Sequence, residues 1–146
     1  MNKPVTPALV VVADDDPDDC LMIREAFEDQ CADCTLCFVH DGEELMEFLH
    51  GQHPDRAGPS CPIPDLLLLD LNMPLKDGRQ SLQEIKSDPR LKMLPTVIMT
   101  TSSDEDDRAF CRQRGANDYI VKPSRYSELL DVVESLKEQW INKKHD

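Results

Sequence analysis

Short apolar runs alternate with amphipathic helical segments along the chain, and this alternation limits its fold more than any other feature. Leu66 to Leu69 is an unbroken leucine run that ends on Asp70, as expected of a strand covered on both faces. Other apolar runs predict further strands at Leu9–Ala13, Leu36–Val39, Thr96–Met99 and Tyr119–Val121. Strands that alternate with helices favour a parallel sheet with helices on both faces, the α/β doubly wound class.

Local signals place the helices after these strands. Asp16 and Pro17 are typical of a helix start, and Gly115 is typical of a helix end. The predicted helical stretches are 17–29, a shorter one around 45–49, then 78–87, 104–114 and 126–140. Residues 51–64 hold two glycines and four prolines, which predicts a long loop. We expect one domain over residues 1–146, with a core of about 8–140 and no output domain.

Composition excludes several classes of partner. The chain has 146 residues, 40% hydrophobic and 31% charged, with a net charge of −13. Such an acidic chain is unsuited to nucleic acid or to an anionic membrane surface, because both require basic patches. No signal peptide or membrane-length apolar run is present, so a cytoplasmic location is expected. A metal cation or a partner with a basic face suits the charge better.

Polar residues stand where the predicted strands end. Asp14, Asp15 and Asp16 follow the first strand, whereas Asp70, Thr100 and Lys122 follow the third, fourth and fifth. In doubly wound sheets, the carboxyl ends of the strands form the working edge. The sequence therefore predicts an acidic cluster with one hydroxyl and one lysine at this edge.

Phosphoryl transfer to a carboxylate would use all of these groups. Mg²⁺ prefers oxygen ligands, which Asp14, Asp15 and Asp70 can supply. A carboxylate can attack phosphorus and form an acyl phosphate. The repulsion between the two anions would be reduced by Mg²⁺ and by the ammonium of Lys122, and Thr100 can donate a hydrogen bond to a phosphoryl oxygen.

The same residues resemble the receiver domain of bacterial two-component response regulators, over nearly the whole chain. The matching motifs are VVVADDDPDD, LLLLDLNMPLKDG, LPTVIMTTS and DYIVKP. The resemblance implies a flavodoxin-like (βα)5 fold with strand order 2-1-3-4-5. It further implies that Asp70 is the phosphoacceptor and that Asp14, Asp15, Asp70 and the backbone carbonyl of Asn72 bind Mg²⁺.

Other family properties follow from the same motifs. Lys122 is implied as the site lysine, Thr100 as the switch hydroxyl and Tyr119 as the switch aromatic. The bond between Lys122 and Pro123 is implied to be cis. The partners are a sensor histidine kinase and a downstream target or phosphotransfer protein, and the domain catalyses only its own phosphorylation and dephosphorylation.

Subfamily features are similar to those of stand-alone regulators paired with phytochrome-type kinases. They are the long loop, TTSS after the fourth strand and a tryptophan near the end of the last helix. Apolar residues on the last helix also predict a homodimer that uses the region from the fourth strand onward. Ser124 stands where many receivers have phenylalanine, and this departure weakens the expectation of the dimer common in the family.

Other functions fit the residues less well. An EF-hand loop would start at Asp14 and end at Glu25, but Asp19 occupies the position that needs glycine. A haloacid-dehalogenase-type phosphatase would carry a second aspartate at the position of Asn72. A nucleotide or flavin carrier would need a glycine-rich loop after the first strand. His50, His53 and Cys61 suggest zinc, although solvated polar residues explain them better.

The cysteines are expected to be reduced thiols. Cys31, Cys34 and Cys37 form a CxxCxxC run, but a metal or iron–sulfur site requires a fourth ligand that is missing at useful spacing. A reducing cytoplasm keeps thiols free. We expect this run to be a helix-end turn that leads into a strand.

Overall fold

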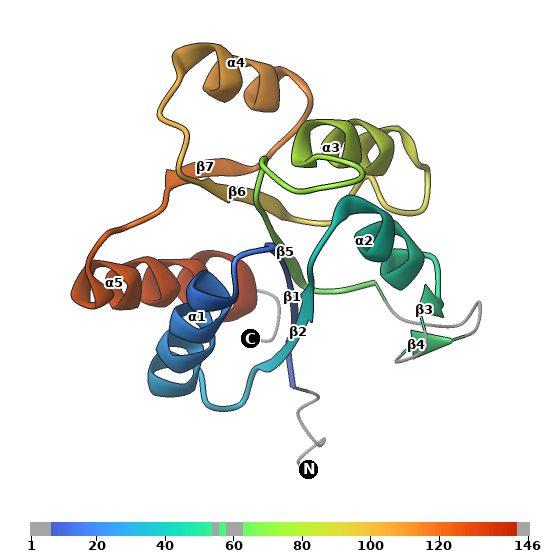
Figure 1. Cartoon of the computed structure of the whole chain (residues 1–146). Helices are drawn as coiled ribbons and strands as arrows, with labels where there is room; N and C mark the ends of the chain where they lie inside the picture. Colours follow the sequence, from blue (N-terminus) through green and yellow to red (C-terminus); the bar gives the residue numbers. More distant parts are fainter. Residues whose placement is uncertain (1–6, 54–55, 58–62, 143–146) are drawn as a thin grey trace.

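The computed structural model describes residues 7–53, 56–57 and 63–142. Within this part, parallel strands form one sheet in the order β2-β1-β5-β6-β7, which confirms the predicted flavodoxin-like fold (Figure 1). The strands are β1 (Leu9–Ala13), β2 (Thr35–Val39), β5 (Leu66–Leu69), β6 (Thr96–Thr100) and β7 (Asp118–Val121). The helices are α1 (Pro17–Gln30), α2 (Gly42–Leu49), α3 (Gly78–Ser87), α4 (Glu105–Gln113) and α5 (Tyr126–Leu136).

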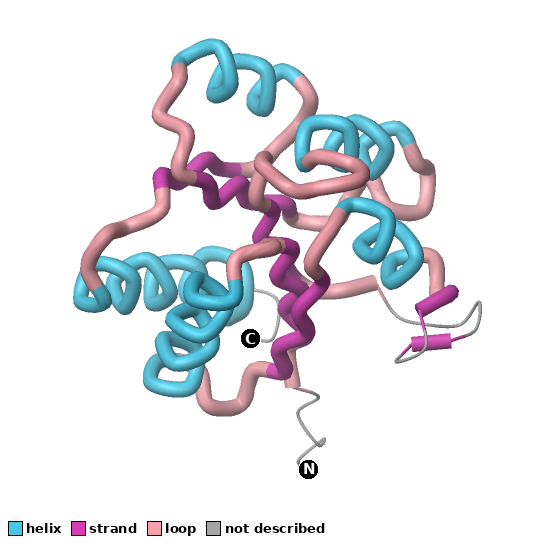
Figure 2. Tube along the Cα trace, in the orientation of Figure 1, coloured by secondary structure: helices cyan, strands magenta, loops and turns pink. Residues whose placement is uncertain are grey.

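The helices form a layer on each side of the sheet (Figure 2). Residues of α1 and α5 pack with Leu66 and Leu68 on one face. Residues of α2 and α3 pack with Leu67 and Leu69 on the other face, together with Cys111 of α4. Alternate side chains of a strand point to opposite faces, so a leucine at each position of β5 fills both cores. All the leucines of this strand are buried.

Aspartates begin most of the helices. The side chain of Asp16 accepts hydrogen bonds from the backbone N–H groups of Asp18 and Asp19, at 2.9 and 3.4 Å. Asp41, Asp77 and Asp104 cap α2, α3 and α4 in the same way. A carboxylate satisfies N–H groups that have no partner within the helix and is stabilised by the helix dipole. Some of the aspartates that make the chain acidic therefore stabilise helix N-termini.

Two elements differ from the prediction. The expected loop 51–64 contains a short antiparallel ladder between β3 (Gln52–His53) and β4 (Arg56–Ala57), because two-residue strands are too short to leave a periodic signal. The last helix is regular only to Leu136, and Lys137–Asn142 continues it as a π-helical segment that contains Trp140. In the described residues, no helix has the length and apolarity required to cross a bilayer.

Two expectations about covalent geometry were wrong. Among the described residues all peptide bonds are trans, so the bond before Pro123 adopts the lower-energy isomer rather than the implied cis form. Cys31 and Cys34 are not free thiols, because they are joined by a disulfide. The turn between α1 and β2 brings their Cα atoms to 5.5 Å, which is within disulfide range.

Candidate phosphoacceptor site

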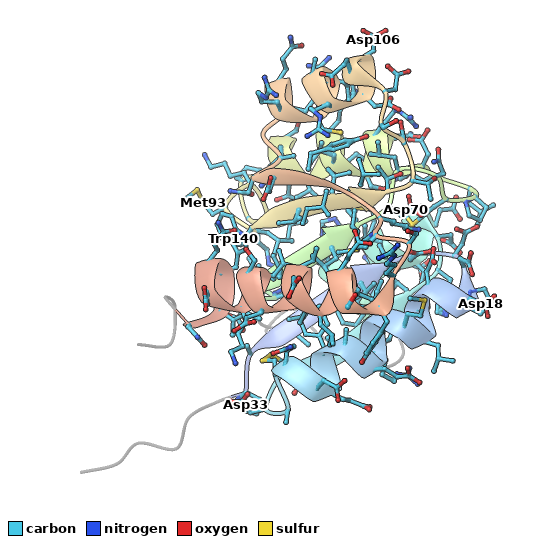
Figure 3. All side chains as sticks on the ribbon, turned by 90° about the vertical axis from the view of Figure 1, so that its left-hand side faces the viewer. Asp18, Asp33, Asp70, Met93, Asp106 and Trp140 are labelled. Atoms are coloured by element: carbon cyan, nitrogen blue, oxygen red, sulfur yellow. A yellow bond between two sulfur atoms is a disulfide. The ribbon has the colours of Figure 1, made fainter. Side chains whose placement is uncertain are left out.

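The carboxyl ends of four strands bring the predicted site residues to one edge of the sheet. The backbone N–H of Asp70 donates to the carbonyl of Ala13 at 3.0 Å, and that of Lys122 donates to Thr100 at 2.7 Å. These bonds extend the strand pairing by one residue past β5 and β7. Asp14 and Asp70 are consequently held on the neighbouring ends of β1 and β5, whereas Lys122 follows β7, two strands from β5. Figure 3 labels Asp70 at this edge.

The ammonium of Lys122 lies among three carboxylates. Its Nζ is 2.8 Å from Asp14 Oδ2, 2.7 Å from Asp19 Oδ2 and 2.9 Å from Asp70 Oδ2. The side chains of Asp14 and Asp70 are only 3% and 6% exposed. Buried charges are tolerated only when paired, so these contacts hold the two carboxylates in place.

The pKa values of Lys122 and Asp14 reflect this crowding. Burial alone would lower the pKa of Lys122, but hydrogen bonds to Asp14, Asp19 and Asp70 outweigh it and raise that pKa. Burial raises the pKa of Asp14, and the bonds from Lys122 and the Asp16 N–H only partly offset this rise. One cation therefore does not fully compensate the buried negative charge.

Asp19 is a site residue that the sequence analysis missed. It lies in the first turn of α1, four residues before buried Ile23 and seven before buried Ala26. Residues at this spacing share a helix face, so Asp19 lies on the sheet-facing side of α1, with its side chain 31% exposed. Helical spacing from the apolar face could have revealed it.

The acidic cluster fits a divalent cation. Asp14, Asp15 and Asp70 each offer a carboxylate oxygen, and these oxygens lie within 4.8 Å of one another. Asp14 and Asp70 are buried and Asp15 is exposed, so the cluster has a buried side and an open side. Hard oxygen ligands of this kind suit Mg²⁺ or Mn²⁺. The role of the Asn72 carbonyl stays a prediction, while the N–H of Asn72 donates to Asp70 Oδ1 at 3.2 Å.

The loop after Asp70 passes very close to the start of α3. A Cβ atom on Gly78 would lie 2.7 Å from the Cα of Leu71 and would also overlap the Asp70 carbonyl. The N–H of Gly78 donates to the Leu71 carbonyl at 2.9 Å. Only glycine permits this approach, so Gly78 shapes the loop that follows Asp70.

Thr100 and Tyr119 are linked through the loop that follows β6. Thr100 is fully buried, and its Oγ1 accepts from the Ser102 N–H at 3.5 Å. The hydroxyl of Tyr119 donates to the Ser102 carbonyl at 2.8 Å. The guanidinium of Arg108 lies 4.7 Å from the centre of the Tyr119 ring. Burial raises the pKa of Tyr119, which keeps the hydroxyl a hydrogen-bond donor.

The structure argues against the EF-hand and does not test the zinc hypothesis. Asp18 and Asp19 are part of α1 and Asp16 caps it, so the acids do not form an EF-hand loop. His50 lies 3.9 Å from Asp88, whereas Cys61, the third residue of the zinc hypothesis, lies outside the described residues.

Known proteins share both the sequence and the fold. The family model for the response regulator receiver domain matches residues 10–134. The response regulator Rcp1 of Synechocystis is 34% identical over 135 residues, which are 92% of this chain and 90% of Rcp1. The structure of the phosphorylated cyanobacterial phytochrome response regulator RcpA is 36% identical, with a TM-score of 0.85 over 94% of this chain and 96% of RcpA.

A second solved structure bears on the metal. The Mn²⁺-bound form of Rcp1 is 34% identical and has a TM-score of 0.81 over 92% of this chain and 95% of that one. Divalent metal thus binds a receiver domain similar to this chain, whose acidic cluster has the ligands that such a cation needs. The family match, the fold and the cluster agree, and the chain belongs to the response regulator receiver domain family.

Proposed function

We propose that Asp70 accepts a phosphoryl group from a sensor histidine kinase in a Mg²⁺-dependent reaction. The observation that carries this proposal is the environment of the Asp70 carboxylate. It is buried at a strand end, 2.9 Å from Lys122 Nζ and within 4.8 Å of ligand oxygens of Asp14 and Asp15.

The chain's own groups have distinct parts in this reaction. A carboxylate oxygen of Asp70 attacks phosphorus, the bond from phosphorus to the donor histidine nitrogen breaks, and an aspartyl phosphate forms. Lys122 offsets negative charge on the transferred group. The N–H of Asn72 holds Oδ1 of Asp70, which orients the carboxylate. Mg²⁺, when bound, supplies charge neutralisation that a single ammonium cannot provide.

Phosphorylation would change the surface near α4 and β7. An added phosphate brings about two negative charges and strong acceptor oxygens, toward which the hydroxyl of Thr100 would move. Tyr119 would then turn inward beside β6. Both residues form hydrogen bonds with Ser102, so movement of one would change the contacts of the other. A downstream target or a phosphotransfer protein would recognise the new surface.

The partner class follows from the relatives. RcpA is a phytochrome response regulator, and we extend that pairing to a phytochrome-type kinase for this chain. We further infer that residues 1–146 act as one receiver domain, which catalyses only its own phosphorylation and dephosphorylation. We place the protein in the cytoplasm, where a histidine kinase has access to ATP.

The proposal also includes a homodimer that uses the region from β6 to α5. The edge strand β7 supports it, because Val121 on this strand is 38% exposed. The apolar residues of α5 support it less, since Leu129, Val133 and Leu136 are buried within the domain.

The test of the acceptor compares Asp70→Asn with Asp18→Asn. Asp18 is exposed at the start of α1 and makes no contact with Lys122 among the contacts of the described residues. After incubation with acetyl phosphate and Mg²⁺, intact mass measurement should show a phosphorylated adduct in the wild type and in Asp18→Asn. Asp70→Asn should show none, and an adduct that persists there would refute the assignment.

A further inference from the structure

The disulfide between Cys31 and Cys34 lies outside the phosphoacceptor site. Cys31 is the C-cap residue of α1, where its N–H donates to the Phe27 carbonyl at 2.7 Å. Cys34 directly precedes β2, and its N–H donates to the Cys31 carbonyl at 3.0 Å. The two sulfurs thus close a tight turn between α1 and β2, at the end of α1 opposite to Asp19.

A surface cavity lies over the disulfide. It has a volume of about 230 Å³ and is lined by Cys31 and Cys34 together with Arg24 and Glu28. Another cavity, of about 330 Å³, is lined by Asp14, Asp15 and His40 among others. Cys31 is only 5% exposed and Cys34 is half-buried. Thiol exchange needs access to one sulfur, and Cys34 is the less buried of the two residues.

We propose that Cys31 and Cys34 form a redox-active pair that exchanges reversibly with a thiol or dithiol reductant of the glutathione or thioredoxin class. In reduction, a reductant thiolate attacks the sulfur of Cys34 and the bond to Cys31 breaks. A second reductant thiol releases Cys34 and forms the reductant disulfide. The two electrons and two protons lost by the reductant end on the two cysteine thiols, and oxidation reverses these steps.

The surroundings favour the disulfide over the dithiol. A helix C-terminus carries partial negative charge, which disfavours a thiolate. The Oδ1 of Asp33 lies 3.6 Å from the Cys31 sulfur, and Figure 3 labels Asp33 at this end of the molecule. Redox pairs at helix N-termini have stabilised thiolates. This pair lacks that stabilisation, so we expect it to be a weaker oxidant than such pairs, and one that reducing glutathione buffers still open.

The oxidised pair would cross-link the turn between α1 and β2. A disulfide that closes so short a loop stabilises the fold modestly. We therefore expect reduction to lower the Tm by roughly 5 °C. The effect should not require phosphorylation, because neither cysteine contacts Asp70 or Lys122 among the contacts of the described residues.

The experiment equilibrates the full chain in glutathione buffers from reducing to oxidising. Thiols are then blocked with N-ethylmaleimide and located by peptide mass mapping. The positions Cys31 and Cys34 should change from labelled to unlabelled across the series, and the Tm should rise with this change. Cys37→Ser, a change outside the disulfide, and Asp70→Asn should behave like the wild type. Cys31→Ser/Cys34→Ser should have a Tm that does not depend on the buffer.

Three results would overturn the proposal. The pair could remain fully labelled in every buffer, or remain a disulfide in every glutathione buffer. Reduced protein could also be protected from labelling by Zn²⁺ alone, since Cys31, Asp33 and Cys34 have ligand atoms within 4.8 Å of one another. Protection by Zn²⁺ without any oxidation in the glutathione series would assign the pair to a metal site.

Discussion

At the scale of single residues, the site depends on an imbalance of charge around Lys122. One ammonium contacts three carboxylates, and exposed Asp15 adds a fourth negative group to the cluster. Lys122 therefore stabilises the buried carboxylates without neutralising them. The remaining negative charge is what attracts a divalent cation.

We predict that Mg²⁺ stabilises the protein and that Asp15→Asn removes much of this effect. A ligand at about 100 times its dissociation constant stabilises the folded state by about 2.7 kcal/mol. Loss of one carboxylate ligand should weaken the affinity for Mg²⁺ at least about tenfold, which corresponds to about 1.4 kcal/mol of binding free energy. Without Mg²⁺, Asp15→Asn should be as stable as the wild type or more so, because like charges are fewer.

Urea unfolding with and without Mg²⁺ measures this difference. The control is Asp18→Asn, which removes one negative charge from the same end of α1 but leaves the cluster intact. If Mg²⁺ raised the free energy of unfolding equally in Asp15→Asn and in the wild type, Asp15 would not bind the metal.

At the scale of elements, a polar network joins α3 to α4 and to the loop after β6. Arg79 of α3 donates from Nε to Asp107 Oδ1 of α4 at 2.9 Å. Its Nη2 lies 2.8 Å from the same oxygen. Ser102 donates to Asp107 Oδ2 at 2.7 Å. Tyr119 donates to the carbonyl of the same Ser102. Asp107 therefore connects the helix after the Asp70 loop with the region of the proposed switch.

We predict that Asp107→Asn destabilises the protein in a pH-dependent way. Hydrogen bonds from Ser102 and Arg79 hold the pKa of Asp107 below its usual value. Such a carboxylate contributes stability above its unfolded pKa and loses it as the pH falls through the folded pKa. The wild type should exceed Asp107→Asn by about 1 kcal/mol at neutral pH. Below a pH of about 4, this difference should shrink.

Urea unfolding of both proteins from neutral to acidic pH gives the comparison. Asp106→Asn, a neighbouring exposed residue, is the control and should show little difference at any pH. A difference between wild type and Asp107→Asn that stays constant with pH would contradict the role of the charge.

Because the loop after Asp70 passes close to the start of α3, we predict that any side chain at position 78 destabilises the protein. Gly78→Ala would place a Cβ against backbone atoms of Asp70 and Leu71, which cannot move aside as a side chain could. We expect a loss of about 1–3 kcal/mol in the free energy of unfolding and slower phosphorylation by acetyl phosphate. Gln80→Ala, on the exposed side of the same helix, should change neither. Unchanged stability and rate in Gly78→Ala would show that the loop can relax.

At the scale of the whole molecule, the apolar surface is mostly used inside the domain. The apolar side chains of α5 pack on α1 and the sheet, although the sequence suggested that some of them would face a partner. Among the described residues, the large hydrophobic side chains that stay exposed are those of Leu21, Leu75, Met93 and Val121. They come from different elements, so any self-association through them should be moderate to weak.

We predict a homodimer that uses the β7 edge and is weakened by Val121→Asp. A charge on this half-exposed position should raise the dimer dissociation constant at least about tenfold, or about 1.4 kcal/mol. Leu21→Asp, at an exposed apolar position of α1, should leave it unchanged. Analytical ultracentrifugation with and without beryllofluoride is the measurement. Only monomer at high concentration under both conditions would refute the dimer.

The sequence by itself determined the strands of the parallel sheet, most helix starts and the residues at the ends of these strands. These features are local, because the period of apolar residues and the capping aspartates depend on neighbours along the chain. The leucines before Asp70 identified a central strand, and Asp16 with Pro17 identified the start of α1. The order of strands followed from the family resemblance, and the structure confirmed it.

Only the tertiary structure decided which distant residues meet. Asp19 and Lys122 are 103 residues apart, and their contact depends on where the fold places the start of α1 relative to the end of β7. The network around Asp107 likewise joins it to Arg79, 28 residues away, a contact that no local pattern encodes. The disulfide and the trans bond before Pro123 are local features, but the sequence pattern did not reveal either of them. The apolar face of α5 shows the same limit, since periodicity reveals that a face is buried but does not reveal whether the sheet or a partner covers it. Packing free energy, summed over the whole core, settles these choices.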